Sequence, residues 1–502
     1  MLHISRKNVL LMLLVLTAYL SSSCEKEQIA PSNQEVAFVK YYGHVGAQTA
    51  TDVVQTADGG YILLGSTNSY SSTDKRDIFV VKTDSLGNEL WSSAFGRQEG
   101  NVDANFDYLR FDEEGIRIIE LPDQSAYIVA ANRTYYNYPS STSQGTGVEG
   151  QTKIVLYQLD HATGAPTTTD GVELQSNTNT QFTEKVSDMK LDTAGGYSYI
   201  ITGYSTNVKR SKPYNNDQTG GAYDNTDVFT VLLNSDFIIP SGWRSSNWFY
   251  GFPWDDYGTS IQILPQGYLI CGISHDGATA PSTQTGNFLP EIHVVLVDKS
   301  GGTPLSRKTI SVDGDYFSGA YSVYDADNNV VTIAAHVTKN EASTNGNDGQ
   351  AVLLQLQILG LQITEVTAGA TVSPFLRYYD LKDRNGNGGV HSVASIALLP
   401  GNNGFIMSST HEATLFESDI CITKFDTNLD IDTGTGWPYF FGYADGNSLV
   451  LTSDQAGTIL PIMSGSTAQS SLTGYVFTGK FGLGTNNMMG LVKLNLNGTL
   501  SP

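Results

Sequence analysis

The histidines are the first residues whose type could do chemistry, because imidazole nitrogens bind metal ions. Three of the eight histidines, His275, His336 and His411, each follow an apolar β-type run in separate stretches of the chain. If these stretches are neighbouring repeats, equivalent positions lie roughly 10 Å or more apart, whereas zinc holds nitrogen ligands at ~2.1 Å. We therefore predict no metal site at these histidines.

A second candidate is the run DRNGNG at residues 383–388. It places oxygen-bearing side chains at alternate positions from Asp383 and a glycine at the turn, as in the first half of a calcium loop. The twelfth position, where a calcium loop has glutamate, is Ala394. A glycine-rich connection and a calcium site both stay open, and we predict neither a metal nor another cofactor.

Catalytic patterns give no candidate residue. The sequence contains no Gly-x-Ser-x-Gly elbow and no Ser-x-Asp-x-Gly-x-Thr-Trp box. Carboxylates are plentiful, and two of them could act as acid and base on a glycosidic bond, but no spacing singles out such a pair. We predict no catalytic residue and expect a protein that is not an enzyme.

Aromatic residues are the remaining candidates, because Tyr and Trp offer a large apolar body with a polar tip to sugars and protein partners. Basic residues stand among them, at Arg133, Lys209, Arg210 and Lys212. Two interpretations stay open: a binding patch, or aromatic side chains that pack long loops together. The predicted binding residues are Tyr135, Tyr136, Tyr138, Tyr214, Tyr223 and Trp254.

An internal repeat supplies the elements that would position these residues. Residues 51–96 contain four apolar β-type runs separated by turns rich in Gly, Asn and Asp, which predicts a four-stranded antiparallel unit, strands a to d. The first large residue of strand b recurs at steps of 62 to 75 residues, which defines seven units. These residues are Tyr61, Tyr127, Tyr197, Tyr268, Val330, Phe405 and Tyr475.

The two ends of the chain complement each other. The seventh unit stops after its third strand, whereas residues 35–46 (EVAFVKYYGHVG) have the aromatic-aromatic-Gly ending of a fourth strand. Pairing them would close a ring and satisfy edges that otherwise invite aggregation. We predict an all-β seven-bladed β-propeller of four-stranded antiparallel blades, spanning residues 35–502 and closed by the N-terminal strand.

The repeats resemble those of secreted bacterial propellers, and residues 79–91 are similar to pyrroloquinoline-quinone-type repeats. The vicinal cysteine pair common in those dehydrogenases is absent.

Loop lengths favour one face of the ring. The expected b-to-c connections are long in units two, three and four, over about residues 132–151, 204–226 and 274–290. In a propeller these connections share a face with the d-to-a connections, and loops on a rigid scaffold commonly carry binding residues. The predicted aromatic residues lie in or beside these connections.

The first 23 residues are typical of a secretion signal. Arg6 and Lys7 precede a twelve-residue apolar run, which is too short to span a membrane core of about 30 Å. Ser21-Ser22-Ser23-Cys24 resembles the cleavage box of Bacteroidota-type lipoproteins, which implies a lipid on Cys24. Residues 24–34 then read as a polar tether, and its charged start, Glu25, Lys26 and Glu27, resembles the export signals of surface lipoproteins.

Composition limits the partners. The chain has 28 basic and 50 acidic residues; two of the basic residues lie in the signal, so the remainder carries a formal charge of −24. Such a surface repels nucleic acid. Besides Cys24 only Cys271 and Cys421 occur, both in apolar runs, so we expect buried thiols and no disulfide framework.

The expected function combines these points. We expect an outer-membrane lipoprotein, held by its lipid at the cell surface, that acts as a non-catalytic binding or scaffold subunit. Its partner would be an outer-membrane protein complex for export or nutrient uptake, or a glycan. The alternative is a polysaccharide-acting enzyme with its site over the central channel.

Overall fold

A computed structural model describes residues 37–70, 75–97, 108–138, 148–174, 183–206, 226–244, 249–250, 255–274, 290–312, 315–337, 349–365, 376–382, 389–401, 403–414, 417–442, 453–464, 471–483 and 486–500. They belong to one compact unit that begins at Ala37. The predicted signal, Cys24, the tether and the Asp383 run lie outside the described residues. No helix in the described part of the chain is long and apolar enough to cross a membrane.

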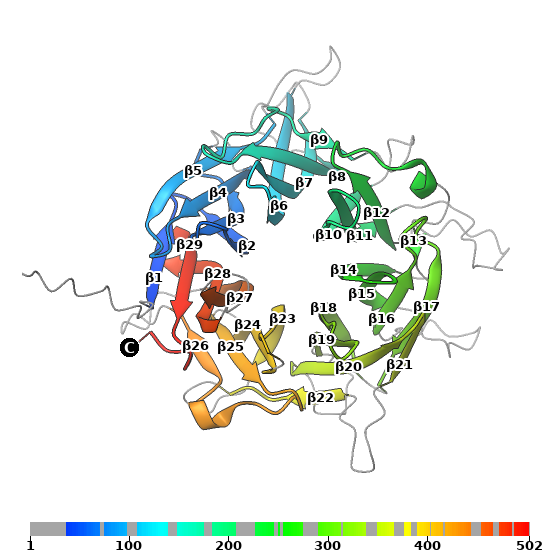
Figure 1. Ribbon diagram of the computed structural model, residues 1–502. Helices are drawn as coiled ribbons and strands as arrows, with labels where there is room; N and C mark the ends of the chain where they lie inside the picture. Colours follow the sequence, from blue (N-terminus) through cyan, green and yellow to red (C-terminus); the bar gives the residue numbers. More distant parts are fainter. Residues whose placement is uncertain are drawn as a thin grey trace, which may run out of the picture. The chain divides into compact units, whose positions relative to one another are not determined.

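The unit is a ring of seven antiparallel sheets arranged around a central axis (Figure 1), with strand order following the sequence in each of the first six blades. Blade 1 contains β2 (Gln48–Gln55), β3 (Tyr61–Thr67), β4 (Asp77–Thr83) and β5 (Glu89–Phe95). Blade 2 contains β6 (Tyr108–Glu120), β7 (Ala126–Tyr138), β8 (Val148–Asp160) and β9 (Val172–Glu173). Blade 3 contains β10 (Glu184–Asp192), β11 (Ser198–Ser205), β12 (Asp227–Asn234) and β13 (Phe249–Tyr250). Blade 4 contains β14 (Asp256–Leu264), β15 (Gly267–Ser274), β16 (Glu291–Val297) and β17 (Pro304–Ile310).

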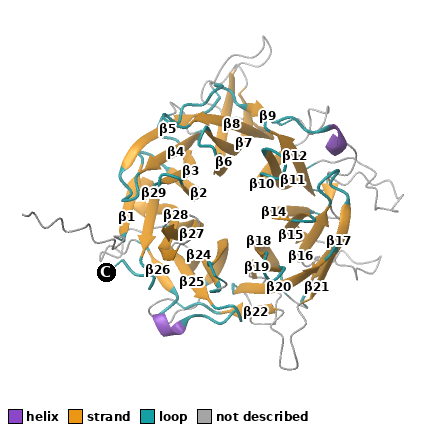
Figure 2. Cartoon of the chain, in the orientation of Figure 1, coloured by secondary structure: helices purple, strands orange, loops and turns teal. Residues whose placement is uncertain are grey.

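The last three blades complete the ring. Blade 5 contains β18 (Phe317–Asp325), β19 (Val330–Val337), β20 (Ala351–Leu359) and β21 (Gln362–Glu365), with β22 (Leu376–Tyr379) also paired to β20. Blade 6 contains β23 (Val390–Leu398), β24 (Phe405–Thr414), β25 (Glu417–Phe425) and β26 (Tyr439–Phe441). Blade 7 contains β27 (Gln455–Ser464), β28 (Ser471–Leu483), β29 (Asn486–Leu494) and β1 (Phe38–Tyr42). Helical structure in the described residues is limited to the short 3-10 turns η1 (Ser241–Arg244) and η2 (Thr433–Thr435), drawn in purple in Figure 2.

The predicted closure is confirmed. β1 pairs with β29 from Phe38 opposite Lys493 to Tyr42 opposite Met489. The Tyr42 hydroxyl also donates to the carbonyl of Gly87 in the c-to-d turn of blade 1, at 2.7 Å. The first strand of the ring therefore fills the outer edge of the last blade and contacts the neighbouring blade.

Every blade has a β-bulge at the same place, in the innermost strand opposite a small residue of strand b. That small residue is Gly65 in blade 1 and Gly203 in blade 3. Four positions before it stands the large buried residue that we used to count the repeats. By this register the residue in blade 3 is Tyr199, not Tyr197, and in blade 5 it is Val331, not Val330. The predicted alignment was wrong there by two residues and by one.

Neighbouring blades are joined by hydrogen bonds close to the bulges. Asp52 of blade 1 accepts the Ile118 N–H of blade 2, and Asp188 of blade 3 accepts the Ile261 N–H of blade 4, each at 3.0 Å. The ring closes through the Thr458 hydroxyl of blade 7, which donates to Asp52 at 2.7 Å. These bonds join blade 1 to blade 2, blade 3 to blade 4 and blade 7 to blade 1 beside the channel.

The two cysteines of the propeller are buried free thiols, as expected. Burial raises the pKa of each thiol to about 12. Neither thiol is therefore a nucleophile near neutral pH.

The expected b-to-c loop of blade 2 is mostly strand. β7 runs on to Tyr138 and β8 begins at Val148, so the connection is confined to residues 139–147. The three inner strands of this blade each have 13 residues, against seven to nine for most strands of the ring. Residues 134–138 (TYYNY) continue the strand after Arg133. We had interpreted their polar and aromatic composition as that of a loop.

Candidate functional site

Each blade contributes to the lining of the central channel one residue that stands at or directly after its bulge. Because the bulge is shared, these seven positions stand at one level of the channel. They are Asp52, Arg117, Asp188, Ser260, Tyr321, Ser395 and Thr458.

Arg117 is the charged centre of this ring. Its Nε donates to Asp188 at 2.8 Å, and its guanidinium lies 3.7 Å from Asp52. Burial alone would lower the pKa of Arg117, but Asp188 and Asp52 outweigh it and raise that pKa. Burial likewise acts to raise the pKa of Asp188, but Lys190, Arg117 and the Ile261 N–H outweigh it and lower that pKa. The blade 2 cation thus bridges two carboxyl groups from the blades on either side.

Two cavities meet at Arg117 and Tyr321, the two residues that line both of them. The lower cavity, about 340 Å³, lies toward the a-to-b turns. The upper cavity, about 430 Å³, is lined by earlier residues of the innermost strands and by late residues of strand b, so it opens toward the b-to-c connections. Its size falls in the range of about 300–1,000 Å³ that ligand pockets occupy.

The upper cavity is mixed in character. Glu114, Lys185 and Lys480 supply charge, Thr49, Asn132 and Gln455 supply neutral polar groups, and Tyr204 and Tyr321 supply aromatic rings. The Tyr204 ring is held edge-on against Tyr257, with ring centroids 5.0 Å apart. Glu114 is the single carboxylate among the described residues that line this cavity. Such a lining can bind a polar ligand with hydroxyl groups.

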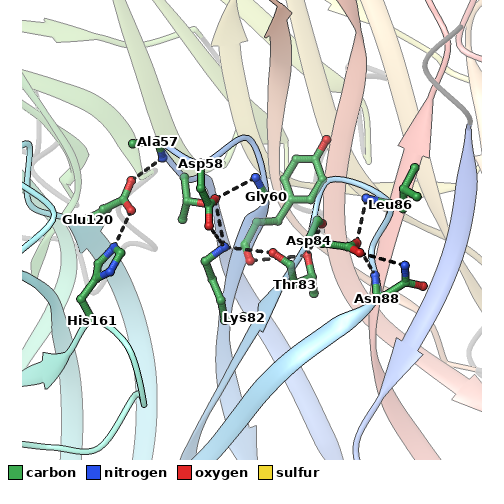
Figure 3. Close-up of polar contacts among 12 residues, drawn as sticks. Ala57, Asp58, Gly60, Lys82, Thr83, Asp84, Leu86, Asn88, Glu120 and His161 are labelled. Carbon is green, nitrogen blue, oxygen red and sulfur yellow. Dashed lines mark hydrogen bonds and ion pairs between the residues drawn. The ribbon is translucent and has the colours of Figure 1, made fainter. Parts of the chain in front are cut away.

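At the opposite face the polar groups are bound within the protein. In blade 1 the Lys82 ammonium, with its side chain 4% exposed, donates to both Asp58 oxygens at 3.0 and 2.8 Å and to the Thr83 carbonyl (Figure 3). Burial opposes ionisation of Asp58, but the bonds from Lys82 and Thr56 lower its pKa to about 2. Asp84 accepts the N–H groups of Leu86 and Asn88 in the next turn. These contacts stabilise the short turns and leave this part of the face few groups for a ligand.

A further contact in Figure 3 joins blade 1 to blade 2 at the same face. Glu120 accepts the Ala57 N–H at 2.7 Å and contacts His161 Nε2 at 2.9 Å. His161 in turn stacks on Tyr127, with ring centroids 4.6 Å apart and planes inclined by 15°. Its contacts assign this histidine to packing within blade 2.

The predicted aromatic residues fall into two groups. Tyr135 and Tyr136 lie on β7; Tyr135 donates to Glu173 and packs edge-on against Phe111, and Lys75 lies over the Tyr136 ring at 3.6 Å from its centroid. These contacts support the packing interpretation for both residues. The side chain of Tyr138, also on β7, and the residues Tyr214, Tyr223 and Trp254 lie outside the described residues, so their predicted role stays a prediction.

We had expected Arg133 to belong to an exposed basic patch, and this expectation was wrong. It is 1% exposed and donates to Glu113 and to Glu173, each at 2.6 Å, and to the Tyr157 hydroxyl at 2.7 Å. Burial raises the pKa of Glu113 although the charge of Arg133 opposes the rise. The perturbed carboxyl group is sealed inside blade 2 and faces neither cavity.

His336 and His411, two of the three histidines singled out in the sequence, lie near a further histidine, His391, that we had not considered. His391 is buried beside His411, with ring centroids 4.6 Å apart, and His336 accepts the Val393 N–H at 3.3 Å. Burial lowers the pKa of His336 and of His391 to about 4. The described residues contain no group of three or more His, Cys, Asp or Glu that could hold a metal ion, and His275 lies outside them.

Seven antiparallel blades around a channel define the chain as a seven-bladed β-propeller. No protein-family model matches the sequence, and none of the curated proteins does. Solved structures match over most of the chain. They include a Synechocystis apocarotenoid oxygenase (10% identity, TM-score 0.37, 91% of this chain and 92% of that chain) and a glucose dehydrogenase (12%, 0.36, 75% and 97%). A third is an N-acetylgalactosamine deacetylase from F. plautii (11%, 0.35, 80% and 92%). At these identities ligand and reaction must be argued from the site.

Proposed function

We propose that this propeller is a non-catalytic, lipid-anchored protein of the outer membrane that binds a glycan in its upper cavity. The observation that carries the proposal is the cavity itself, a concave site on the face of the long connections with hydroxyl, amide, ammonium and aromatic groups. A glycan ligand suits it better than a protein partner, because stable protein interfaces bury about 1,200–2,000 Å² of largely flat surface. An outer-membrane complex could then engage the outer strands while the cavity holds sugar.

The enzyme alternative is less well supported. Glycoside hydrolysis ordinarily needs a pair of carboxyl groups, one of which stays protonated to act as acid. In the channel Asp52 and Asp188 are bound to Arg117, and contacts lower the pKa of Asp188. The upper cavity has Glu114 without a second carboxylate in the described lining. The chemistry of these residues favours binding over hydrolysis.

Binding and turnover can be measured on the same samples. The secreted form, beginning after residue 24, would be titrated by calorimetry with a panel of oligosaccharides, and each mixture would then be analysed for cleavage products. We expect saturable binding and intact ligand. Tyr204→Ala should weaken binding at least tenfold, whereas Leu90→Ala on the outer strand β5 should not. Products that accumulate with the parent and disappear with Glu114→Gln would show an enzyme instead.

A further inference from the structure

The charge balance of the upper cavity is opposite to that of the whole chain. The chain has 50 acidic and 28 basic residues, yet the cavity lining has three cations, Arg117, Lys185 and Lys480, and one carboxylate, Glu114. A cavity that only continued the surface of this protein would be acidic. The excess of cations in the lining favours an anionic ligand.

Two of these charges already have partners. Arg117 is shared by Asp188 and Asp52 in the ring below, and Glu114 lies 3.8 Å from Arg76. Lys185 and Lys480 are different, because neither forms a hydrogen bond or an ion pair with any residue that the structure describes. These two ammonium groups are the charges that remain for a ligand.

Their placement suits a ligand inside the cavity. Lys185 lies on β10 of blade 3 and Lys480 on β28 of blade 7, and these strands lie on opposite sides of the channel (Figure 1). Both side chains are half-buried. Burial lowers the pKa of Lys480 although the charge of Asp454 acts to raise it. Burial of an ammonium group is unfavourable, and an anionic ligand would offset part of this cost.

We infer that the upper cavity binds a carboxylate-bearing saccharide, with its charge balanced by Lys185 and Lys480 and its ring beside Tyr204. This inference rests on the proposed glycan-binding function and adds the chemical class of the ligand. Because Arg117 is already shared by Asp188 and Asp52, Lys185 and Lys480 are the lining cations left to balance an anionic group.

The test compares acidic sugars with matched neutral forms. Calorimetry on the secreted form would use oligogalacturonate, hyaluronan and alginate oligomers and sialyllactose, each beside its methyl ester. We expect at least one acid to bind and its ester to bind at least tenfold more weakly. Affinity for that acid should also fall as salt rises from about 0.05 to about 0.5 M, because the ions screen the contact.

Variants assign the effect to the two lysines. Lys185→Gln and Lys480→Gln should each weaken binding of the acid at least tenfold and leave binding of the ester unchanged, and Lys480→Arg should restore most of the loss. Lys382→Gln, at a side chain 56% exposed and paired with Asp380, is the matched control. Thermal melts would verify that every variant is folded.

The outcomes separate the two proposals. If acid and ester bind equally, or if a neutral glycan alone binds, the carboxylate inference is wrong and the glycan-binding function stands. The same holds if the acid binds but both glutamine variants bind like the parent. If no acidic or neutral sugar binds, both proposals are wrong.

Discussion

At the residue scale, the buried charges of blade 2 act as one structural unit. Arg133 and Glu113 are each 1% exposed and contact each other at 2.6 Å. A buried ion pair costs free energy to form, but removal of one partner costs more, because the other charge is then left buried and unpaired. The pair therefore stabilises the fold only when both residues are present. Tyr135 and Glu173 extend the network toward the surface and hold the long strands of the blade together.

Arg133→Met should therefore lower the free energy of unfolding by about 3–5 kcal/mol, because it leaves the Glu113 carboxylate buried without its cation. The double variant Glu113→Gln/Arg133→Met should lose less than the sum of the two single variants. Denaturant unfolding of all four proteins gives the coupling energy. Strict additivity would show that the pair does not act as a unit.

The buried histidines predict how stability depends on pH. Burial lowers the pKa of His336 and His391 to about 4, and that of His293 to about 3. Between these values and the ordinary histidine pKa of about 6.5, the unfolded chain binds more protons than the folded one, so acid favours unfolding.

Stability should thus be fully present above about pH 6.5 and decline as the pH falls toward 4, by about 2 kcal/mol per histidine at pH 5. Thermal melts between pH 7.5 and 4.5 measure this slope. His391→Asn should flatten it, whereas exchange of His161, which is one-quarter exposed, should not. An equal slope in parent and His391→Asn would contradict this explanation.

At the element scale, β1 is the strand on which the ring depends. It supplies the outer strand of blade 7, and Phe38 and Tyr42 also reach the Gly87 turn of blade 1. Without it β29 becomes an exposed edge between the first and last blades, and exposed edges pair with other chains.

Deletion of residues 37–46 should give a protein that melts at lower temperature, aggregates and is cut rapidly by protease. Deletion of residues 25–34, the predicted tether, is the matched control and should leave the melting temperature unchanged. Melting curves and limited proteolysis on both proteins test this. Equal stability of the two deletion proteins would mean that the pairing of β1 with β29 contributes little.

At the scale of the whole molecule, the direction of the strands fixes which face carries the N-terminal end of the ring. Phe38, at the start of β1, lies against Gly87 in a c-to-d turn, which belongs to the short-turn face. If Cys24 carries a lipid, the chain leads from the membrane to this face, and the upper cavity opens away from it.

Protease added to intact cells should then cut in the connection at residues 139–147, and membrane fractionation should recover the protein with the outer membrane. Cys24→Ser should move the protein to the soluble fraction without changing its melting temperature. Cleavage that begins only after the outer membrane is permeabilised would place the protein on the periplasmic side.

The sequence by itself determined the seven blades, their four-strand pattern and the closing strand, because turns and alternating apolar residues are local signals that recur in every unit. It also indicated that Cys271 and Cys421 are buried. Only the tertiary structure brought Asp52, Arg117 and Asp188 together, since their meeting depends on the bulge register of three blades and on closure of the ring. The same holds for Lys185 and Lys480, which lie far apart in the chain and face one cavity. A comparison of the bulge position across the seven units could have found the ring of channel residues, but a cavity is formed only when blades meet, and no local pattern encodes that. Arg133 shows the reverse case: its neighbours in sequence suggested a loop, and its partners in space made it part of the core.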